Sequence, residues 1–403
     1  MRKALLAMLI GITGVIHAQY QGDGTAYRTI YLEELDSLLR AMPDHILVDV
    51  RSPGEFADTS AWERGNIGRI SGAINIPIDS VGVMFDSLRS FQQRPVVLYC
   101  SHSQRSRRVA QQLADSGFTN VTNVNGGLNR YWIDQGPAMA SLKARVITST
   151  PYTLISGPQL CERITSPSGA LILDVRSDSA FRSIAMSEVE RSHGRLRSAI
   201  NIPLEALAAR IGEIALDVPI VVVDALTDRA PAAARKLLAH GAANVAVLYK
   251  GMEGVRSHGY FHFPCMAREW IERPPYQILS IEVVQPGEIQ RGFNRIIDMR
   301  PDDEYGNAAK DAWKNIGRMT GAVHIPAAEL ASRIEDLAMD KGASVLIYGF
   351  SSNPYVFVAA SMLADLGYTN VHVMANGLFG LRWAAANIKG HEFLRDLVEN
   401  APE

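Results

Sequence analysis

A threefold internal repeat limits what this chain can fold into. A short apolar run that ends in Asp-x-Arg occurs three times, at Ile46–Arg51, Ile172–Arg176 and Ile296–Arg300. The three aspartates of these runs are separated by 125 and 124 residues. Solenoids repeat with periods of about 20–50 residues. The longer period therefore indicates one small domain that is present in three copies.

Three further segments follow in the same order in each copy. A Gly-Ala-Ile-Asn-Ile-Pro segment or a close relative comes first, at Gly72–Pro77, Ser198–Pro203 and Gly321–Pro326. A short apolar strand comes second, at Val96–Tyr99, Ile220–Val223 and Val345–Tyr348. A helix end marked by glycine comes third, at Gly117–Val121, Gly241–Val245 and Gly367–Val371. Strands that alternate with helices predict a parallel sheet with helices on both faces. We expect an α/β protein with tandem domains at 25–136, 146–262 and 276–392.

Residues 1–18 have the pattern of a secretory signal peptide. Arg2 and Lys3 precede an apolar run at Ala4–Ile16, and Ala18 supplies the small residue of a cleavage site. The apolar run is shorter than the roughly 20 residues needed to cross a bilayer. We expect an exported bacterial protein, periplasmic or secreted, with no membrane segment after cleavage. An uncleaved anchor is the alternative.

The net charge and the cysteine content exclude some classes of protein and of site. A net charge of −2 over 403 residues gives no electrostatic basis for binding nucleic acid. Three cysteines are too few for a disulfide scaffold. We expect Cys161 and Cys265 to be unpaired structural cysteines, with a disulfide between them as the alternative. No His and Cys residues cluster at ligand spacing, so we expect neither a metal nor a cofactor.

Cys100 is the candidate nucleophile. It follows the apolar strand Val96–Tyr99, and a helix begins a few residues later. Backbone N–H groups in such a loop, together with the helix dipole, stabilise an anion. We therefore expect Cys100 to have thiolate character and to carry sulfur. Arg105 closes the loop and is expected to bind the resulting anion.

These motifs together resemble the rhodanese family of sulfurtransferases. The resemblance rests on Leu47–Arg51, Gly68–Pro77, Cys100 with Arg105, Gly117–Val121 and Asn125–Trp132, and the three copies extend it over nearly the whole mature chain. It implies α/β modules in which a loop cysteine accepts sulfane sulfur as a persulfide. The donor would be a small anion such as thiosulfate, and the acceptor cyanide or a thiol.

The loop after Cys100 contains the other candidate binding residues. They are Ser101, His102, Ser103, Gln104, Arg105 and Ser106. The Cys-x4-Arg spacing is one residue shorter than in related phosphatases, which favours sulfur over phosphate. Ser103 stands where loops of the family often have glycine, the residue that best tolerates positive φ. We expect His102 to face water at the loop tip. The alternatives are a protonated imidazole that lowers the thiolate pKa, or a residue that steers the acceptor.

The second and third copies lack the nucleophile. Asp224 and Gly349 take the position of Cys100, and we expect Asp224 to pair with Arg229. One active site per chain follows, with the other two copies as scaffold or docking modules for a protein partner. The competing hypothesis is a chain that is a scaffold or binding protein throughout. Because Asp49 and Arg51 recur in all copies, we expect them to give structural support.

Overall fold

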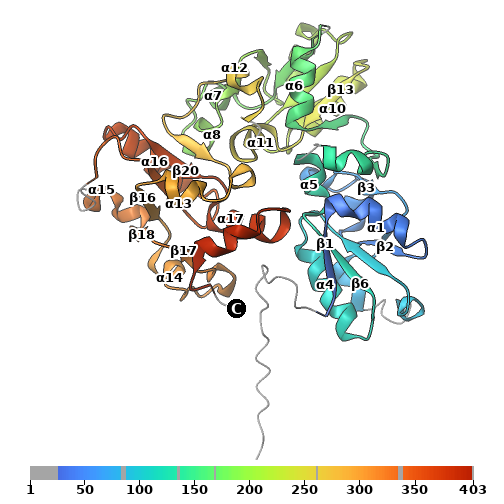
Figure 1. Ribbon diagram of the computed structural model, residues 1–403. Coiled ribbons are helices and arrows are strands. Elements are labelled where there is room, and N and C mark those ends of the chain that lie inside the picture. Colours follow the sequence, from blue (N-terminus) through green and yellow to red (C-terminus); the bar gives the residue numbers. More distant parts are fainter. Residues whose placement is uncertain are drawn as a thin grey trace, which may run out of the picture.

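The computed structural model describes residues 26–82, 88–133, 137–167, 169–259, 262–334 and 339–401. The expected signal peptide lies outside these residues. Within them, no helix is both long and apolar enough to cross a membrane. The chain forms three α/β units placed around a common centre (Figure 1). We call them module 1 (26–147), module 2 (153–271) and module 3 (276–401).

The described residues of module 1 form a five-stranded sheet and four α-helices. Its sheet strands are β1 (Arg28–Tyr31), β2 (Ile46–Asp49), β4 (Ile74–Asn75), β5 (Val96–Tyr99) and β6 (Val121–Asn125). Its helices are α1 (Leu35–Ala41), α2 (Pro53–Ala57), α4 (Gln104–Asp115) and α5 (Gly127–Ile133).

Modules 2 and 3 repeat this plan. The strands of module 2 are β8 (Thr153–Ile155), β9 (Leu171–Asp174), β11 (Ala199–Asn201), β12 (Ile220–Val223) and β13 (Val245–Leu248), and its helices are α6 (Gly157–Thr165), α7 (Asp178–Phe181), α8 (Glu188–Arg191), α9 (Leu207–Arg210), α10 (Ala230–Ala239), α11 (Gly251–Ser257) and α12 (Met266–Glu269). The strands of module 3 are β15 (Gln277–Leu279), β16 (Arg295–Asp298), β18 (Val323–His324), β19 (Val345–Tyr348) and β20 (Val371–Met374), and its helices are α13 (Glu288–Gly292), α14 (Asp302–Tyr305), α15 (Leu330–Arg333), α16 (Pro354–Asp365) and α17 (Gly377–Asn387).

The three sheets share one topology. Their strand orders are β1-β6-β5-β2-β4, β8-β13-β12-β9-β11 and β15-β20-β19-β16-β18, and every pairing within them is parallel. Each begins with an outer strand and places the strand before the candidate loop at the centre. The predicted α/β fold of three tandem modules is confirmed.

Alternating side chains explain why both faces of the first sheet are covered. Val96 and Leu98 of β5 pack with Val109 and Leu113 of α4. The intervening residues Val97 and Tyr99 belong to a core on the opposite face, which also contains Leu35 and Leu39 of α1 and Leu128 of α5. Strand residues i and i+2 share a face, so an unbroken apolar run is required when helices cover both sides.

Each module is closed by a small antiparallel ribbon. β3 (Arg69–Ile70) pairs with β7 (Val146–Ile147), β10 (Arg195–Leu196) with β14 (Trp270–Ile271), and β17 (Arg318–Met319) with β21 (Val398–Glu399). In each case the second strand comes from the segment that follows the last large helix of the module. This segment therefore packs on its own module rather than hanging between modules.

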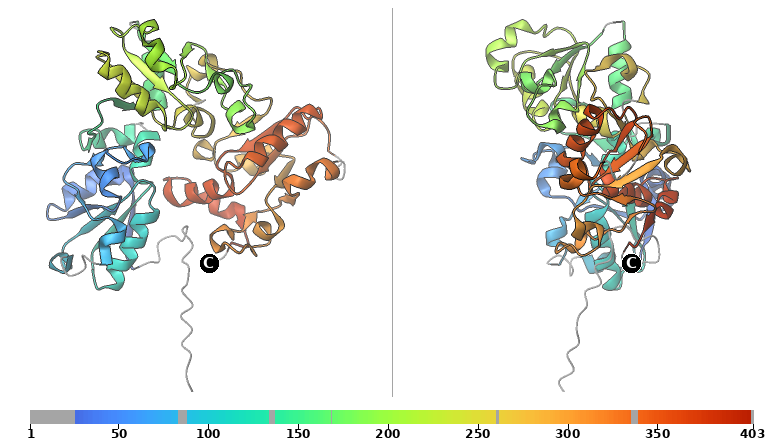
Figure 2. Two further views of the ribbon diagram at one scale, coloured as in Figure 1. Left: turned by 180° about the vertical axis from the view of Figure 1, so that it is seen from behind. Right: turned by 90° about the vertical axis from the view of Figure 1, so that its left-hand side faces the viewer.

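Polar contacts join the modules in pairs. Arg64 and Asp228 form an ion pair at 2.5 Å between modules 1 and 2. Ser361 donates a hydrogen bond of 2.8 Å to Glu188 between modules 3 and 2. The end of α17 reaches from module 3 to module 1, as Figure 1 and the view from behind in Figure 2 (left) show. Its Ala386 carbonyl accepts a hydrogen bond of 2.7 Å from Asn125.

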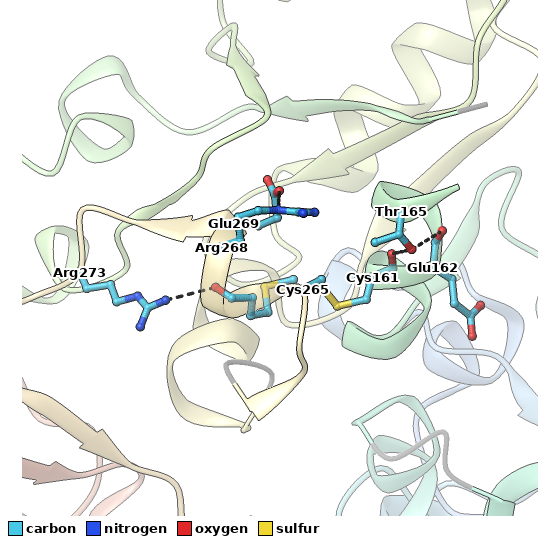
Figure 3. Close-up of a disulfide and its surroundings, with 8 residues drawn as sticks. Cys161, Glu162, Thr165, Cys265, Arg268, Glu269 and Arg273 are labelled. Atoms are coloured by element: carbon cyan, nitrogen blue, oxygen red, sulfur yellow. Dashed lines mark hydrogen bonds and ion pairs between the residues drawn. A yellow bond between two sulfur atoms is a disulfide. The ribbon is translucent and has the colours of Figure 1, made fainter. Parts of the chain in front are cut away.

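Module 2 contains the disulfide that the sequence analysis gave as the alternative to unpaired cysteines. Cys161 of α6 is bonded to Cys265, and the two Cα atoms are 5.6 Å apart (Figure 3). We expected both cysteines to be unpaired, and this was wrong. The bond closes a sequence separation of 104 residues, and no local pattern brings such distant cysteines together. Cys100 is the one cysteine of the chain that remains free.

Candidate active site

Cys100 lies where β5 ends and the loop to α4 begins. Only 1% of the residue is exposed. Its Sγ accepts a hydrogen bond of 3.1 Å from the backbone N–H of Ser103. The hydroxyl of Ser106 is 3.6 Å from the same sulfur, although its nearest acceptor is Asn123 Oδ1 at 2.7 Å. The loop thus folds around the sulfur and presents an N–H group to it.

Ser103 adopts the positive φ that a glycine would tolerate best at this position. Its φ is 84°, in the left-handed region. A hydrogen bond compensates for this conformation, because the Ser103 Oγ accepts the N–H of Gly126 at 2.6 Å. Thr227 in module 2 also has a positive φ of 70°, and its hydroxyl accepts the N–H of Lys250 at 2.8 Å. In both modules the hydroxyl of the positive-φ residue therefore links the loop, by a hydrogen bond, to the turn after the neighbouring strand.

Arg105 is held by a carboxylate that the sequence analysis did not single out. Its guanidinium donates to Glu55 Oε2 at 2.6 Å and Oε1 at 2.7 Å, and to Ser101 Oγ at 3.0 Å. Burial alone would raise the pKa of Glu55, but the Arg105 cation outweighs it and holds that pKa below its usual value. Arg105 therefore closes the loop as expected, while its charge is balanced by Glu55.

His102 is only partly exposed and lies against the other modules, whereas we expected it to face water. Its carbonyl accepts a hydrogen bond of 3.2 Å from the indole of Trp383 in module 3, and its Nδ1 lies 2.9 Å from Ser101 Oγ. Burial, followed by the charge of Lys250 in module 2, lowers the pKa of His102 to about 3. The imidazole is neutral near pH 7, so it supplies no cation to the thiolate.

The remaining predicted loop residues have distinct surroundings. The Ser101 carbonyl accepts the N–H of Asn129 at 2.9 Å, which ties the loop to α5. Tyr249 of module 2 donates its hydroxyl to the side chain of the same Asn129. Gln104 begins α4 and is exposed. Residues of all three modules therefore surround the Cys100 loop.

Asp49 and Arg51 form an ion pair in the protein interior. Both side chains are fully buried, and Arg51 Nη2 donates to Asp49 at 2.7 Å and to the Gly68 carbonyl at 2.6 Å. Equivalent pairs link Arg176 with Asp174 and Arg300 with Asp298. In all three modules the arginine thus links the end of a strand to a glycine carbonyl in the polar segment that follows.

The loop of module 2 encloses a carboxylate in place of the thiol. Asp224 Oδ1 accepts the N–H of Thr227 at 2.6 Å, and Oδ2 accepts those of Arg229 at 2.6 Å and Ala230 at 2.8 Å. We expected Asp224 to pair with the Arg229 side chain, but that side chain binds Glu205 instead. Burial raises the pKa of Asp224, against the lowering effect of the three N–H groups.

An aromatic side chain fills the loop of module 3. A Cβ atom on Gly349 would lie 2.8 Å from the hydroxyl of Tyr355. This hydroxyl accepts the N–H of Phe350 at 3.5 Å. The space above Gly349 is therefore taken up by the chain itself.

Sequence reasoning missed Glu55, Trp383 and the contacts of α17. Glu55 left a signal, because Glu55-Phe56 recurs as Glu304-Tyr305 at the same distance after Asp-x-Arg. Trp383 left none, since it lies far along the chain from His102. Across the residues that the structure describes, no group of three or more His, Cys, Asp or Glu side chains is arranged to hold a metal ion.

Curated proteins match one module-sized part of the chain. The uncharacterized protein YqhL of Bacillus subtilis is 38% identical over 85 residues, which are 21% of this chain and 59% of that protein. The adenylyltransferase and sulfurtransferase UBA4 of Meyerozyma guilliermondii is 30% identical over 100 residues, 23% of this chain and 22% of that protein. A sulfurtransferase of Allochromatium vinosum is 29% identical over 96 residues, 24% of this chain and 79% of that protein. The chain thus spans about three fifths of the first relative and about a fifth of the second.

Solved structures are similar at low identity. Thiosulfate sulfurtransferase from Pseudomonas aeruginosa is 17% identical with a TM-score of 0.24, over 86% of this chain and 66% of that one. The family model described as rhodanese-like domain matches three times, at residues 32–134, 158–258 and 286–384. Each match contains four of the five strands of one sheet, and together the matches cover most of the chain. The chain therefore belongs to the rhodanese-like domain family, and it contains three such domains in tandem.

Proposed function

We propose that this chain is an exported sulfurtransferase that carries sulfur as a persulfide on Cys100. The thiolate attacks the outer sulfur of thiosulfate, the sulfur–sulfur bond of the donor breaks, and sulfite leaves with the electron pair. Cyanide or a thiolate then attacks the outer sulfur of the persulfide, which regenerates the Cys100 thiolate. With cyanide, the product is thiocyanate.

The carboxylate of module 2 carries this proposal. A carboxylate oxygen of Asp224 lies two bonds beyond Cβ, as the outer sulfur of a cysteine persulfide does. It accepts the N–H groups of Arg229 and Ala230, whose counterparts in module 1 are Arg105 and Ser106. First-turn N–H groups of a helix have no carbonyl partner within the helix. The same fold in module 2 thus presents two N–H groups to an oxygen at the position that corresponds to the outer sulfur of a persulfide, which supports the proposal.

Modules 2 and 3 are proposed to act as scaffold. The loop of module 2 is filled by Asp224 and that of module 3 by Tyr355. Neither a carboxylate nor a phenol forms a persulfide. Both modules instead place residues against the Cys100 loop, through Tyr249 and Trp383. A chain that is a scaffold throughout is the competing function, and the same experiment separates the two.

The test is the intact mass of the protein after incubation with thiosulfate. We expect a gain of one sulfur atom that disappears on adding cyanide, with thiocyanate released. Cys100→Ser should show no gain, whereas Cys161→Ser/Cys265→Ser should still show it. A protein that takes up sulfur from no sulfane donor, while Cys100 remains alkylatable, would be a scaffold. Export predicts cleavage after Ala18, which N-terminal sequencing of the exported protein measures.

A further inference from the structure

The cation within the Cys100 loop itself, Arg105, is balanced by a carboxylate. Both carboxylate oxygens of Glu55 bind Arg105. Arg107 in the first turns of α4 is bonded to Asn125 and to the Ala386 carbonyl of module 3. Arg107 keeps its charge, since both acceptors are neutral, but Glu55 offsets the charge of Arg105. A dianionic donor that approaches the Cys100 thiolate therefore gains from a further cation, because like charges repel at short range.

Lys250 of module 2 is placed to supply this charge. It precedes α11 with a φ of 63°, and its Nζ lies over the ring of Tyr249, 5.5 Å from the centroid. The hydroxyl of Tyr249 binds the side chain of Asn129, and the N–H of Asn129 binds the Ser101 carbonyl at 2.9 Å. Two hydrogen bonds thus lead from the ring beneath Lys250 to the residue next to Cys100.

The electrostatics of His102 agree with a position of Lys250 near the loop. After burial, the charge of Lys250 is the strongest influence that lowers the pKa of His102, and it acts more strongly than Arg105, which belongs to the same loop. The ammonium itself is partly desolvated, since burial lowers the pKa of Lys250. A desolvated cation interacts more strongly with an incoming anion than an exposed one does.

The acids near Lys250 are already engaged. Glu282 is bonded to His258 at 2.6 Å and to Arg130 at 3.4 Å. Glu253 is bonded to His193 and Arg256. Within the described residues, no carboxylate lies at ion-pair distance from the Lys250 ammonium. It therefore remains available for an exogenous anion.

We propose that Lys250, a residue of the thiol-free module 2, is the anion-binding residue for donors that react at Cys100 in module 1. This inference rests on the proposed function where the anion is a sulfur donor. It makes the Cys100 site complete only when both modules are present. Lys250 would bind the charged end of the donor while the loop N–H groups receive the transferred sulfur.

The test compares two alkylating reagents on Cys100 in the full chain. Iodoacetate is an anion and iodoacetamide is neutral, so the ratio of their rates reports the charge near the thiol. We expect Lys250→Gln to lower the iodoacetate-to-iodoacetamide ratio by about threefold or more at low ionic strength. Lys250→Arg and the exposed control Lys143→Gln should retain the ratio of the unaltered protein.

The outcomes distinguish this inference from the proposed function. An unchanged ratio in Lys250→Gln overturns the inference, and so does an equal loss of rate with both reagents, which indicates a structural role. If the ratio falls while no sulfane donor adds sulfur to the unaltered protein, the proposed function fails and the anion site stands. If sulfur is added, Lys250→Gln should raise the KM for thiosulfate by a similar factor.

Discussion

Modules 1 and 2 have the same loop after their central strand but differ in their cysteines, which are free in module 1 and bonded in module 2. Module 1 keeps Cys100 free inside the loop, where one N–H group contacts its sulfur. Module 2 fills its loop with Asp224, which takes three N–H groups. Its nearby cysteines are joined to each other in a disulfide. In both loops backbone N–H groups face the side chain that follows the central strand, and that side chain decides whether a nucleophile is present.

The largest expected effect concerns the disulfide of module 2. Cys161→Ser/Cys265→Ser should lower the unfolding free energy of this module by about 4 kcal/mol, because the bond closes a long loop and restricts the unfolded chain. Hydrogen exchange of the β12 and β13 amides measures this change. Persulfide formation at Cys100 should persist under conditions where module 2 stays folded. Exchange rates that match those of the unaltered protein would contradict the prediction.

Asp224, which fills the loop of module 2, should contribute nearly as much to the unfolding free energy as the disulfide does. Asp224→Ala leaves three buried N–H groups without their acceptor, which we expect to cost about 3 kcal/mol of unfolding free energy. Cys100→Ala is the matched control in module 1 and should cost about 1 kcal/mol, because a thiol is a weak acceptor. Urea denaturation of both variants checks the difference. Equal losses would show that the two loops are not held in different ways.

Glu55 offers a smaller effect, specific to module 1. Glu55→Gln keeps the shape of the side chain but removes the charge that balances Arg105. We expect a loss of about 2 kcal/mol, below the value for a fully buried pair because the Arg105 side chain is 29% exposed. The corresponding residue of module 2 is Ala180, so no such pair exists there. Denaturation midpoints measure the loss, and an unchanged midpoint would show that the pair adds nothing.

The smallest effect is expected at Ser103. Ser103→Gly relieves a positive φ but removes the hydroxyl that binds the Gly126 N–H. These effects oppose each other, and the unfolding free energy should change by less than about 1 kcal/mol. Thr227→Gly is the parallel variant in module 2. A loss above about 2 kcal/mol in either variant would mean that the hydroxyl fixes the loop more firmly than its geometry suggests.

Local sequence patterns predicted the fold and the position of the candidate loop. Asp-x-Arg, the central strand and the glycine after the helix depend on neighbours in the chain, so their recurrence located all three modules. The partners of the loop depend on tertiary contacts. Trp383 reaches His102 across more than two hundred residues, and Arg105 finds Glu55 on a different helix. Asp224 shows that residue type alone does not predict a partner. A carboxylate suggested an arginine side chain, but backbone N–H groups bind it instead.

The small ribbons affect how the chain can be divided. β7 follows the last large helix of module 1 and still pairs with β3 of the same module. A fragment that ends at residue 136 would expose the edge of β3 and the apolar residues beneath β7. Fragments for expression or domain exchange should therefore include Ile147 for module 1 and Ile271 for module 2. The structural unit then includes the segment after the last large helix, and only residues 148–152 and 272–275 are left between one unit and the next.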